Sequence, residues 1–314
     1  MPVLRRLVSA VRHGEWLRHR AVALAAADQR PVRAIARSAA GERDVSDIVF
    51  PISLDPFVIA FARDAGEPVT EASEVRMRED SGEELGAIRL APAGTVRHSA
   101  GHLDLFMPTG SAVFCLRSAE LAWRYAAAWR HMRVNAKRPG AFAMCFADLK
   151  ALNVFYMMPR PVYLVTVMEQ DRGNMFPMDL VGPLGNDRFL LALRTTSHAI
   201  ATIVDTRRIA VGGAPARLKD LAYRLGGQHR ERSLDWRSLE LATRPSPQFG
   251  FPVAADALGV RELDVCDSQV VGSHMVFVTN VARRLDRGDE PQLCHVSDMY
   301  ARWRALRGRS FVDA

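Results

Sequence analysis

The chain has 314 residues, of which 48% are hydrophobic and 25% are charged, so it can bury the core of one large domain or of two ordinary ones. No stretch approaches the ~20 consecutive apolar residues that cross a bilayer, which argues against a membrane-spanning helix. The formal net charge is +7, almost entirely from arginine, which indicates either an arginine-rich composition or an attraction to phosphates, nucleotides or nucleic acid.

The four cysteines are widely spaced and form no CxxC or CxxH pattern, which argues against a zinc site and a redox dithiol. They are Cys115, Cys145, Cys266 and Cys294. We expect reduced, mostly buried thiols, as in a cytoplasmic protein, and no metal site. The apolar run Ala21–Ala27 is shorter than the core of a secretion signal, whereas an arginine-rich organelle transit peptide is less easily excluded.

Residues 1–40 are predicted to form one or two short helices. Leu4, Leu7, Val8 and Val11 recur at helical spacing and share one face. The run Ala21–Ala27 is also predicted as helix. The nearby arginines allow a nucleic-acid-binding arm, but a solvated helix that packs its apolar stripe on the rest of the protein is favoured.

Residues 44–116 give a mixed pattern. Phe57–Phe61 is a buried run of uncertain type, and Glu67–Glu84 is predicted as a polar surface segment. Strand-like patterns follow at Leu85–Leu90, His102–Phe106 and Ala112–Leu116. Pro108–Gly110 is predicted as a turn between the last two.

A helix is predicted over Ala119–Val134, with Ser118 as its cap, because apolar residues keep helical spacing there. Trp123 and Trp129 within it are predicted to be core or interface anchors. The sequence shows no internal repeat. Residues 1–145 are therefore predicted to form a mixed α/β region of unknown type.

Strands dominate the second half. Val162–Met168 is rich in β-branched residues, and Gln170–Gly173 is predicted as a hairpin turn. Further strands are predicted at Phe189–Thr195, Arg208–Val211, Glu262–Val265, Met275–Val281 and Gln292–His295. Only two helices intervene, at Ala199–Asp205 and Ala214–Leu225. This pattern favours a closed antiparallel barrel with accessory helices, and the absence of GxGxxG and GxxxxGK[ST] loops argues against a Rossmann or P-loop domain.

Four short segments of this half occur in the order of a known family. They are Pro159–Thr166 (PRPVYLVT), Asn174–Leu180 with Gly185–Asp187, Leu193–His198, and Gly272–Val278 (GSHMVFV). Together they resemble the flavin-reductase-like, FMN-binding split-barrel family over about residues 159–303. The resemblance implies a mainly β (α+β) fold class, with an antiparallel Greek-key split β-barrel and accessory helices at 146–314 after the mixed α/β region at 1–145.

The resemblance implies a homodimer that binds one flavin, FMN or FAD, per subunit near the subunit interface. NAD(P)H would pass hydride to the flavin, and the reduced flavin often leaves to serve a partner oxygenase. The flavin phosphate is expected at Arg194, Thr195, Thr196, Ser197 and His198. That segment ends a strand and begins a helix, where backbone N–H groups and the helix dipole attract anions. The alternative is that Ser197 only caps the helix, with Arg194 in solvent.

Met178, Asp179 and Leu180 match positions that run along the flavin ring in the family. Asp179 departs from the family, which prefers a hydroxyl there. It is expected either to accept a bond from a ring N–H or a substrate, or to point into solvent. Gly185 and Asn186 lie where the family has two small hydroxyl residues. These departures argue against ordinary, promiscuous flavin reduction.

His274 matches the late histidine of the family. We expect it either to contact the nicotinamide or flavin edge as a catalytic residue, or to be a hydrogen-bonded histidine at the start of a strand. The leading hypothesis is an NAD(P)H-dependent flavin oxidoreductase in the cytoplasm, with no membrane partner.

Three alternatives remain. A tightly bound FMN could act on a specific small organic substrate, with residues 1–145 shaping the pocket. The barrel could instead be a non-catalytic flavin- or haem-binding dimer, with His198, His274 and His295 as candidate haem ligands. Nucleic-acid binding by the N-terminal arginines ranks last and predicts an affinity that falls steeply with salt.

Overall fold

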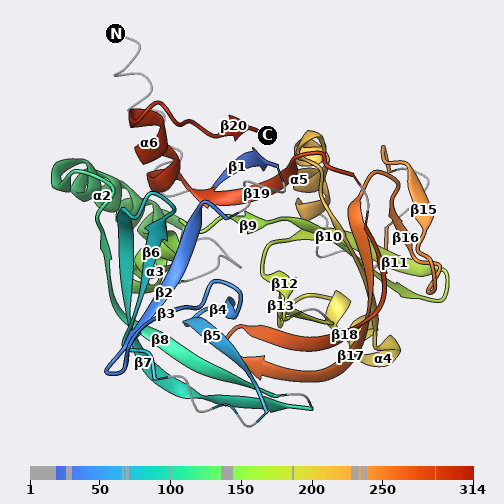
Figure 1. The fold of residues 1–314 in the computed structure, drawn as a ribbon. Helices are drawn as coiled ribbons and strands as arrows, with labels where there is room; N and C mark the ends of the chain where they lie inside the picture. Colours follow the sequence, from blue (N-terminus) through green and yellow to red (C-terminus); the bar gives the residue numbers. More distant parts are fainter. Residues whose placement is uncertain are drawn as a thin grey trace.

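The structure, a computed structural model, describes residues 19–314 apart from 26–29, 66, 68–70, 100, 136–143, 186, 228–232, 235, 237–238 and 287. The predicted helical face at Leu4, Leu7, Val8 and Val11 lies outside the described residues. Two curved sheets lie side by side, one from each half of the chain (Figure 1). They account for most of the strands.

The first sheet has seven strands in the order β3-β2-β6-β7-β8-β5-β4. Its strands are β2 (Val32–Ser38), β3 (Gly41–Asp44), β4 (Val49–Leu54), β5 (Phe57–Asp64), β6 (Glu74–Glu79), β7 (Glu84–His98) and β8 (Gly101–Val113). Every neighbouring pair is antiparallel. We call residues 32–113 the N-terminal repeat, because the second sheet has the same strand order.

The second sheet also has seven strands, in the order β11-β10-β14-β17-β18-β13-β12. Its strands are β10 (Tyr163–Glu169), β11 (Arg172–Met178), β12 (Val181–Pro183), β13 (Arg188–Arg194), β14 (Arg208–Gly213), β17 (Leu258–Val271) and β18 (His274–Leu285). All neighbours are again antiparallel. This sheet, residues 163–285, is the C-terminal repeat, and it confirms the predicted antiparallel split-barrel class.

The two sheets have the same topology. When the strands of each sheet are numbered in chain order, both sheets read 2-1-5-6-7-4-3. The register of the third and fourth strands also agrees. Val49 pairs with Phe61 and Pro51 with Ile59 in one sheet, as Val181 pairs with Leu191 and Pro183 with Phe189 in the other. The chain therefore contains a structural repeat that the sequence analysis did not predict.

Helices and a third sheet connect the repeats. The helices are α2 (Ser118–Asn135), α3 (Phe146–Phe155), α4 (Ala199–Thr206), α5 (Lys219–Gly227), which a 3-10 turn at Ala216–Leu218 precedes, and α6 (Asp298–Leu306). A four-stranded sheet contains β20 (Val312–Asp313), β1 (His19–Leu24), β19 (Gln292–Ser297) and β9 (Arg160–Pro161) in that order. A small hairpin pairs β15 (Thr243–Pro245) with β16 (Pro252–Ala254).

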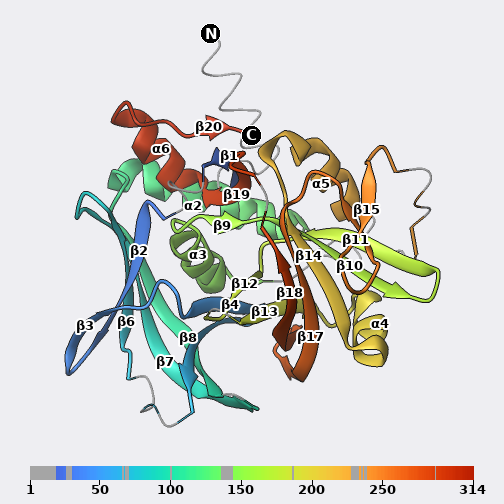
Figure 2. The same cartoon turned by 45° about the vertical axis from the view of Figure 1, so that its right-hand side comes forward.

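Each repeat has its own apolar interior, and a third apolar cluster joins the two. The interior of the N-terminal repeat is covered by α3, which lies against the concave side of that sheet (Figure 2). The interior of the C-terminal repeat is covered by α4. Between them, Ile52 and Ala60 of one repeat pack in the same cluster as Leu190 and Val278 of the other. Burial of this shared face stabilises the placement of the repeats against each other.

Several predicted elements are wrong. Ala21–Ala27 is not a helix, because Ala21–Leu24 belongs to β1 and pairs with β19. The segment Glu67–Glu84 contains β6, in which alternate residues are buried. Pro108–Gly110 is not a turn, since β8 runs through it and only the register shifts there, as at a β-bulge.

Other predictions hold with shifted boundaries. Helix α2 is confirmed, although Trp123 and Trp129 are exposed rather than in the core. The helix predicted over Ala214–Leu225 begins only at Lys219. Helices α3 and α6 were not predicted. All four cysteines are free, and only Cys115 and Cys294 are buried.

Candidate functional site

Two of the predicted site segments come together at one end of the C-terminal repeat. Strand β13 ends at Arg194, whose register partner across the sheet is His274, the first residue of β18. The next residue, Thr195, donates its backbone N–H and its hydroxyl to the Ser273 carbonyl at 3.0 and 3.4 Å. We call residues Arg194–His198 the anion cradle. The strand pairing fixes this segment against the β17–β18 turn.

The anion cradle presents its polar groups to solvent. Arg194, Thr195, Thr196 and His198 are exposed, and Ser197 is half-buried. The cap position of α4 is His198, which makes no side-chain capping bond, so Ser197 does not have the capping role considered above. Hydroxyls, a guanidinium and the first N–H groups of a helix are the groups that hold phosphates, so these residues fit the phosphate end of a flavin.

His274 lies under the cradle as a neutral imidazole. It is 2% exposed, and its Nδ1 lies 2.9 Å from the Ser273 hydroxyl. Burial, helped by the charge of Arg194, lowers the pKa of His274 to about 4. The structure therefore places it as a hydrogen-bonded histidine at a strand start, and at neutral pH it carries no charge.

The N-terminal repeat forms part of this region. At the tip of the β4–β5 hairpin, the Ser53 hydroxyl accepts from the Ser273 N–H at 3.3 Å. The Asp55 N–H donates to the Ser273 hydroxyl at 3.1 Å. Gly272 has φ +53°, and a Cβ there would collide with the Ser53 hydroxyl and come within 2.9 Å of the Asp55 carbonyl. Only glycine fits the turn with the hairpin tip in this position.

Asp179 belongs to a hydrogen-bonded network that the sequence analysis missed. Its carboxylate accepts from the Tyr156 hydroxyl at 3.0 Å and lies 2.7 Å from His295 Nδ1. The other nitrogen of His295 lies 3.1 Å from the hydroxyl of Tyr223. His19 stacks on Tyr156 with ring centroids 3.6 Å apart. The side chain of Asp179 therefore does not point into solvent.

This network keeps Asp179 ionised. Burial alone would raise the pKa of Asp179, but the hydrogen bond and charge of His295, together with His19 and Tyr156, outweigh burial and hold it well below its ordinary value. Burial lowers the pKa of His19 to about 4 despite the nearby carboxylate. The ionised carboxylate can fix the orientation of the Tyr156 hydroxyl and the His295 ring, or it can accept a hydrogen bond from a ligand.

The remaining predicted flavin contacts are dispersed. Met178 ends β11 at the edge of the C-terminal interior, and Leu180 is buried in the cluster between the repeats. Gly185 is exposed beyond the opposite end of β13 from Arg194, and that seven-residue strand spans ~20 Å. Asn186 lies outside the described residues. Leu180 therefore lies near the end of the β12–β13 hairpin that leads into the cradle, whereas Gly185 lies at the opposite end of that hairpin.

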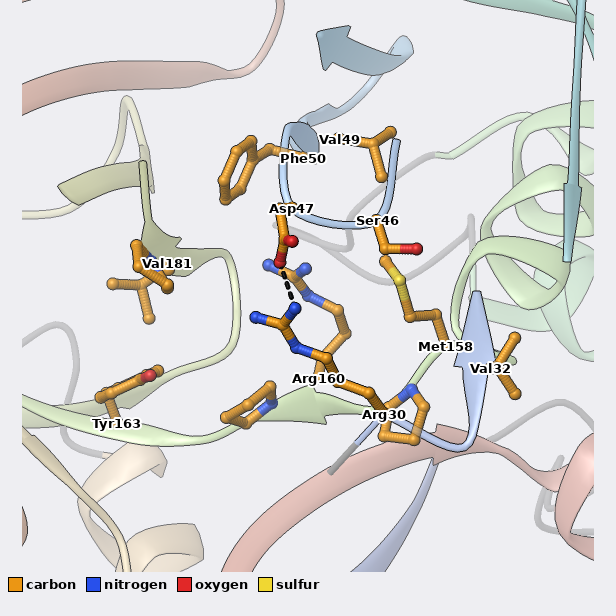
Figure 3. A pocket seen from close by; sticks show the side chains of 14 residues that line it. Arg30, Val32, Ser46, Asp47, Val49, Phe50, Met158, Arg160, Tyr163 and Val181 are labelled. Carbon is orange, nitrogen blue, oxygen red and sulfur yellow. Dashed lines mark ion pairs between the residues drawn. The ribbon is translucent and has the colours of Figure 1, made fainter. Parts of the chain in front are cut away.

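A cavity of about 140 Å³ lies between the repeats (Figure 3). Its lining includes Arg30 and Asp47, which form an ion pair, and Arg160, which lies beside them (Figure 3). Tyr163 and Val181 of the C-terminal repeat also line it. The buried Arg160 also donates to the backbone carbonyl of Asp179 at 3.3 Å, which ties the cavity to the network. Ligand pockets usually exceed roughly 300 Å³, so this cavity accommodates a small molecule or part of a larger one.

No group of three or more His, Cys, Asp or Glu side chains in the described part of the chain is arranged to hold a metal ion. Among the same residues, no helix has the length and apolar character needed to span a membrane.

Residues 155–304 match the family model described as "Flavin reductase like domain". This match confirms the family predicted for residues 159–303, and with it the class of flavin-dependent oxidoreductases. Among curated proteins, none matches the sequence significantly.

Three solved structures illustrate the similarity. An FMN-binding protein from Thermus thermophilus with bound p-hydroxybenzaldehyde is 22% identical, with a TM-score of 0.37 over 41% of this chain and 73% of its own. The NADH:FAD oxidoreductase SgcE6 of Streptomyces globisporus is 15% identical, with a TM-score of 0.42 over 47% and 88%. A nitrilotriacetate monooxygenase component B homologue from Mycobacterium thermoresistibile is 19% identical, with a TM-score of 0.40 over 46% and 83%. Each match covers less than half of this chain.

Proposed function

Because residues 155–304 carry a flavin reductase like domain, we propose that the chain binds FMN or FAD and transfers hydride to it from NAD(P)H. The observation that carries the proposal is the anion cradle, Arg194–His198, fixed against the β17–β18 turn. The cradle would hold the phosphate through its hydroxyls and guanidinium, and α4 would add its N-terminal dipole. When bound, the flavin supplies the redox chemistry, since its ring accepts the hydride.

The chain's own residues would supply orientation and electrostatics. His274 is neutral and buried, so it would position the cradle by packing and hydrogen bonding and would not contribute charge to phosphate binding. Asp179, at a position that the resemblance places along the flavin ring, would offer a fixed negative acceptor. A partner oxygenase that takes the reduced flavin is a further expectation that follows from the resemblance, and a cytoplasmic location follows from the reduced cysteines. The resemblance also implies a homodimeric assembly, for which the internal repeat gives an alternative within one chain.

A second candidate function is a tightly bound flavin that acts on a specific organic substrate. The contact of Ser53 and Asp55 with Ser273 favours it, because the N-terminal repeat then borders the site. The cavity between the repeats, with Arg160 in its wall, would be the place for a small substrate. A haem role for His295 is disfavoured, since Asp179 and Tyr223 engage both of its nitrogens.

The first experiment is to record the visible spectrum of the purified protein after addition of FMN and desalting. Retained flavin bands, bleached by NAD(P)H, would support the reductase. Retained bands with slow NAD(P)H oxidation would support the substrate-specific enzyme. A colourless protein would refute both.

Matched variants then locate the site. Arg194→Ala should weaken flavin binding roughly tenfold or more, because a charge-assisted hydrogen bond contributes about 1.5–3 kcal/mol. The control is Arg283→Ala, an exposed arginine toward the other end of β18 from His274. Equal flavin affinity in both variants would show that the cradle does not bind the flavin phosphate.

A further inference from the structure

The contacts between the two repeats are reciprocal. The tip of the β4–β5 hairpin touches the β17–β18 turn through Ser53 and Ser273. In return, the β12–β13 hairpin of the C-terminal repeat reaches the end of β5, where Arg188 pairs with Asp64 at 2.8 Å. The same Arg188 acts on His98 at the β7–β8 turn, where its charge adds to burial in lowering the histidine pKa. Equivalent hairpins therefore meet equivalent turns, as in an isologous two-fold interface.

The apolar part of the interface has the same reciprocity. The shared cluster takes members from the fourth, sixth and seventh strands of each repeat. It also includes Phe50 and Ile52 of the third strand of the N-terminal repeat, and Leu180 and Leu184, which flank the third strand of the C-terminal repeat. On the fourth strand, Ala60 and Ala62 contribute from one side, and Leu190 and Ala192 from the other. The two repeats bury the same face of the same strands, so they pack as two subunits of a symmetric dimer would.

The strand register identifies which residues are equivalent. Phe61 and Leu191 both pair with the first residue of the third strand. Counting from them along the fourth strand, the position of Arg194 corresponds to that of Asp64. The cross-strand partner of Arg194 is His274, and that of Asp64 is Gly101. The N-terminal repeat therefore has a negative charge where the C-terminal repeat has the arginine of the cradle.

The rest of the cradle is also missing from the N-terminal repeat. After Asp64 the sequence continues Ala-Gly-Glu, whereas after Arg194 it continues Thr-Thr-Ser. Helix α4 has no counterpart among the described residues between β5 and β6. The carboxylate of Asp64 repels a phosphate, and no neighbouring hydroxyls or helix N-terminus in the described residues offset this repulsion.

We propose that the N-terminal repeat is a built-in second subunit. One chain forms the complete two-fold unit, binds one flavin at the C-terminal repeat, and holds none at the equivalent position of the N-terminal repeat. The site is completed by Ser53 and Asp55 of the same chain and requires no residue from a second copy. The inference rests on the proposed function for the identity of the ligand, and on the repeat topology for the number of sites.

The test uses the full-length protein and FMN. Calorimetric titration should give one FMN per chain, and light scattering of the same sample should give the mass of one chain. Arg194→Asp should lower the affinity at least tenfold, and Asp64→Asn should leave it within about twofold. Asp64 is exposed and its pair with Arg188 contributes little, so Asp64→Asn is expected to fold.

The possible outcomes separate the two proposals. Two FMN per chain, or sensitivity to Asp64→Asn equal to that of Arg194→Asp, would overturn the inference while leaving flavin binding intact. One FMN held by a dimer that loses it on dilution would also overturn the inference, because the site would then need a second copy. A wild-type protein that binds no FMN would overturn the proposed function. It would also overturn the single flavin site inferred at the C-terminal repeat.

Discussion

Replacement of Gly272 by alanine tests whether the hairpin tip of the N-terminal repeat is fixed against the flavin-site turn. With φ +53°, an alanine at this position is strained by about 1–2 kcal/mol. In addition, its Cβ would collide with the Ser53 hydroxyl and approach the Asp55 carbonyl to 2.9 Å. Displacing packed atoms costs about 1–3 kcal/mol more. Gly272→Ala should therefore lower the free energy of unfolding by about 2–5 kcal/mol.

The matched control is Gly308→Ala, because Gly308 has a similar φ of +70° and nothing within 4 Å of the added Cβ. It should lose only the backbone strain, about 1–2 kcal/mol. Urea unfolding of both variants and the wild type at neutral pH gives the comparison. Gly272→Ala should also weaken FMN binding, because it displaces Ser273 beneath the cradle. Equal losses of stability, with unchanged FMN affinity, would show that the hairpin tip is not tightly packed there.

The buried polar side chains give three further predictions. Asp179→Asn removes the charge from the hydrogen bond with His295 and should lower the free energy of unfolding by about 1.5–3 kcal/mol at pH 7, measured by urea unfolding; no change would refute a structural role for the charge. Tyr156→Phe keeps the stacked ring and loses one hydrogen bond, so it should lose only about 1 kcal/mol in the same assay. His274 and His19 have folded-state pKa values of about 4, below the ordinary value of 6.5. Their contribution to stability is therefore full above pH 6.5 and lost as the pH falls towards 4, because the unfolded chain binds the protons first; a stability flat over this range would contradict it.

The C-terminal repeat was predictable because its strands carry a local signal. Val162–Met168 is dense in β-branched residues and forms β10 nearly as predicted. Ala21–Leu24, by contrast, is alanine-rich and satisfies a helical pattern equally well. It becomes a strand because β19 offers it a pairing edge, with Val22 and Leu24 buried. Tertiary pairing, rather than local propensity, decides that segment.

The candidate site was predictable only where its residues are close in sequence. The cradle is one continuous stretch at a strand-to-helix junction, so its chemistry is visible locally. The network around Asp179 is different, because Tyr156, His295 and His19 come from three distant segments. The sequence signal was that Asp179 stands where the family prefers a hydroxyl residue. That signal indicated an unusual position but did not identify the partners of Asp179. Only the fold places a histidine beside that carboxylate.

The two repeats also act as an internal comparison of structural and functional requirements. Where the same strand position must satisfy the same packing, the repeats agree, as in Val49 and Val181, which are both buried. At the end of the fourth strand both positions are exposed, but Asp64 replaces Arg194 and reverses the charge. Packing accounts for the residues that agree and not for this difference. A requirement that acts on only one repeat does account for it, and an anion bound at the C-terminal repeat is such a requirement.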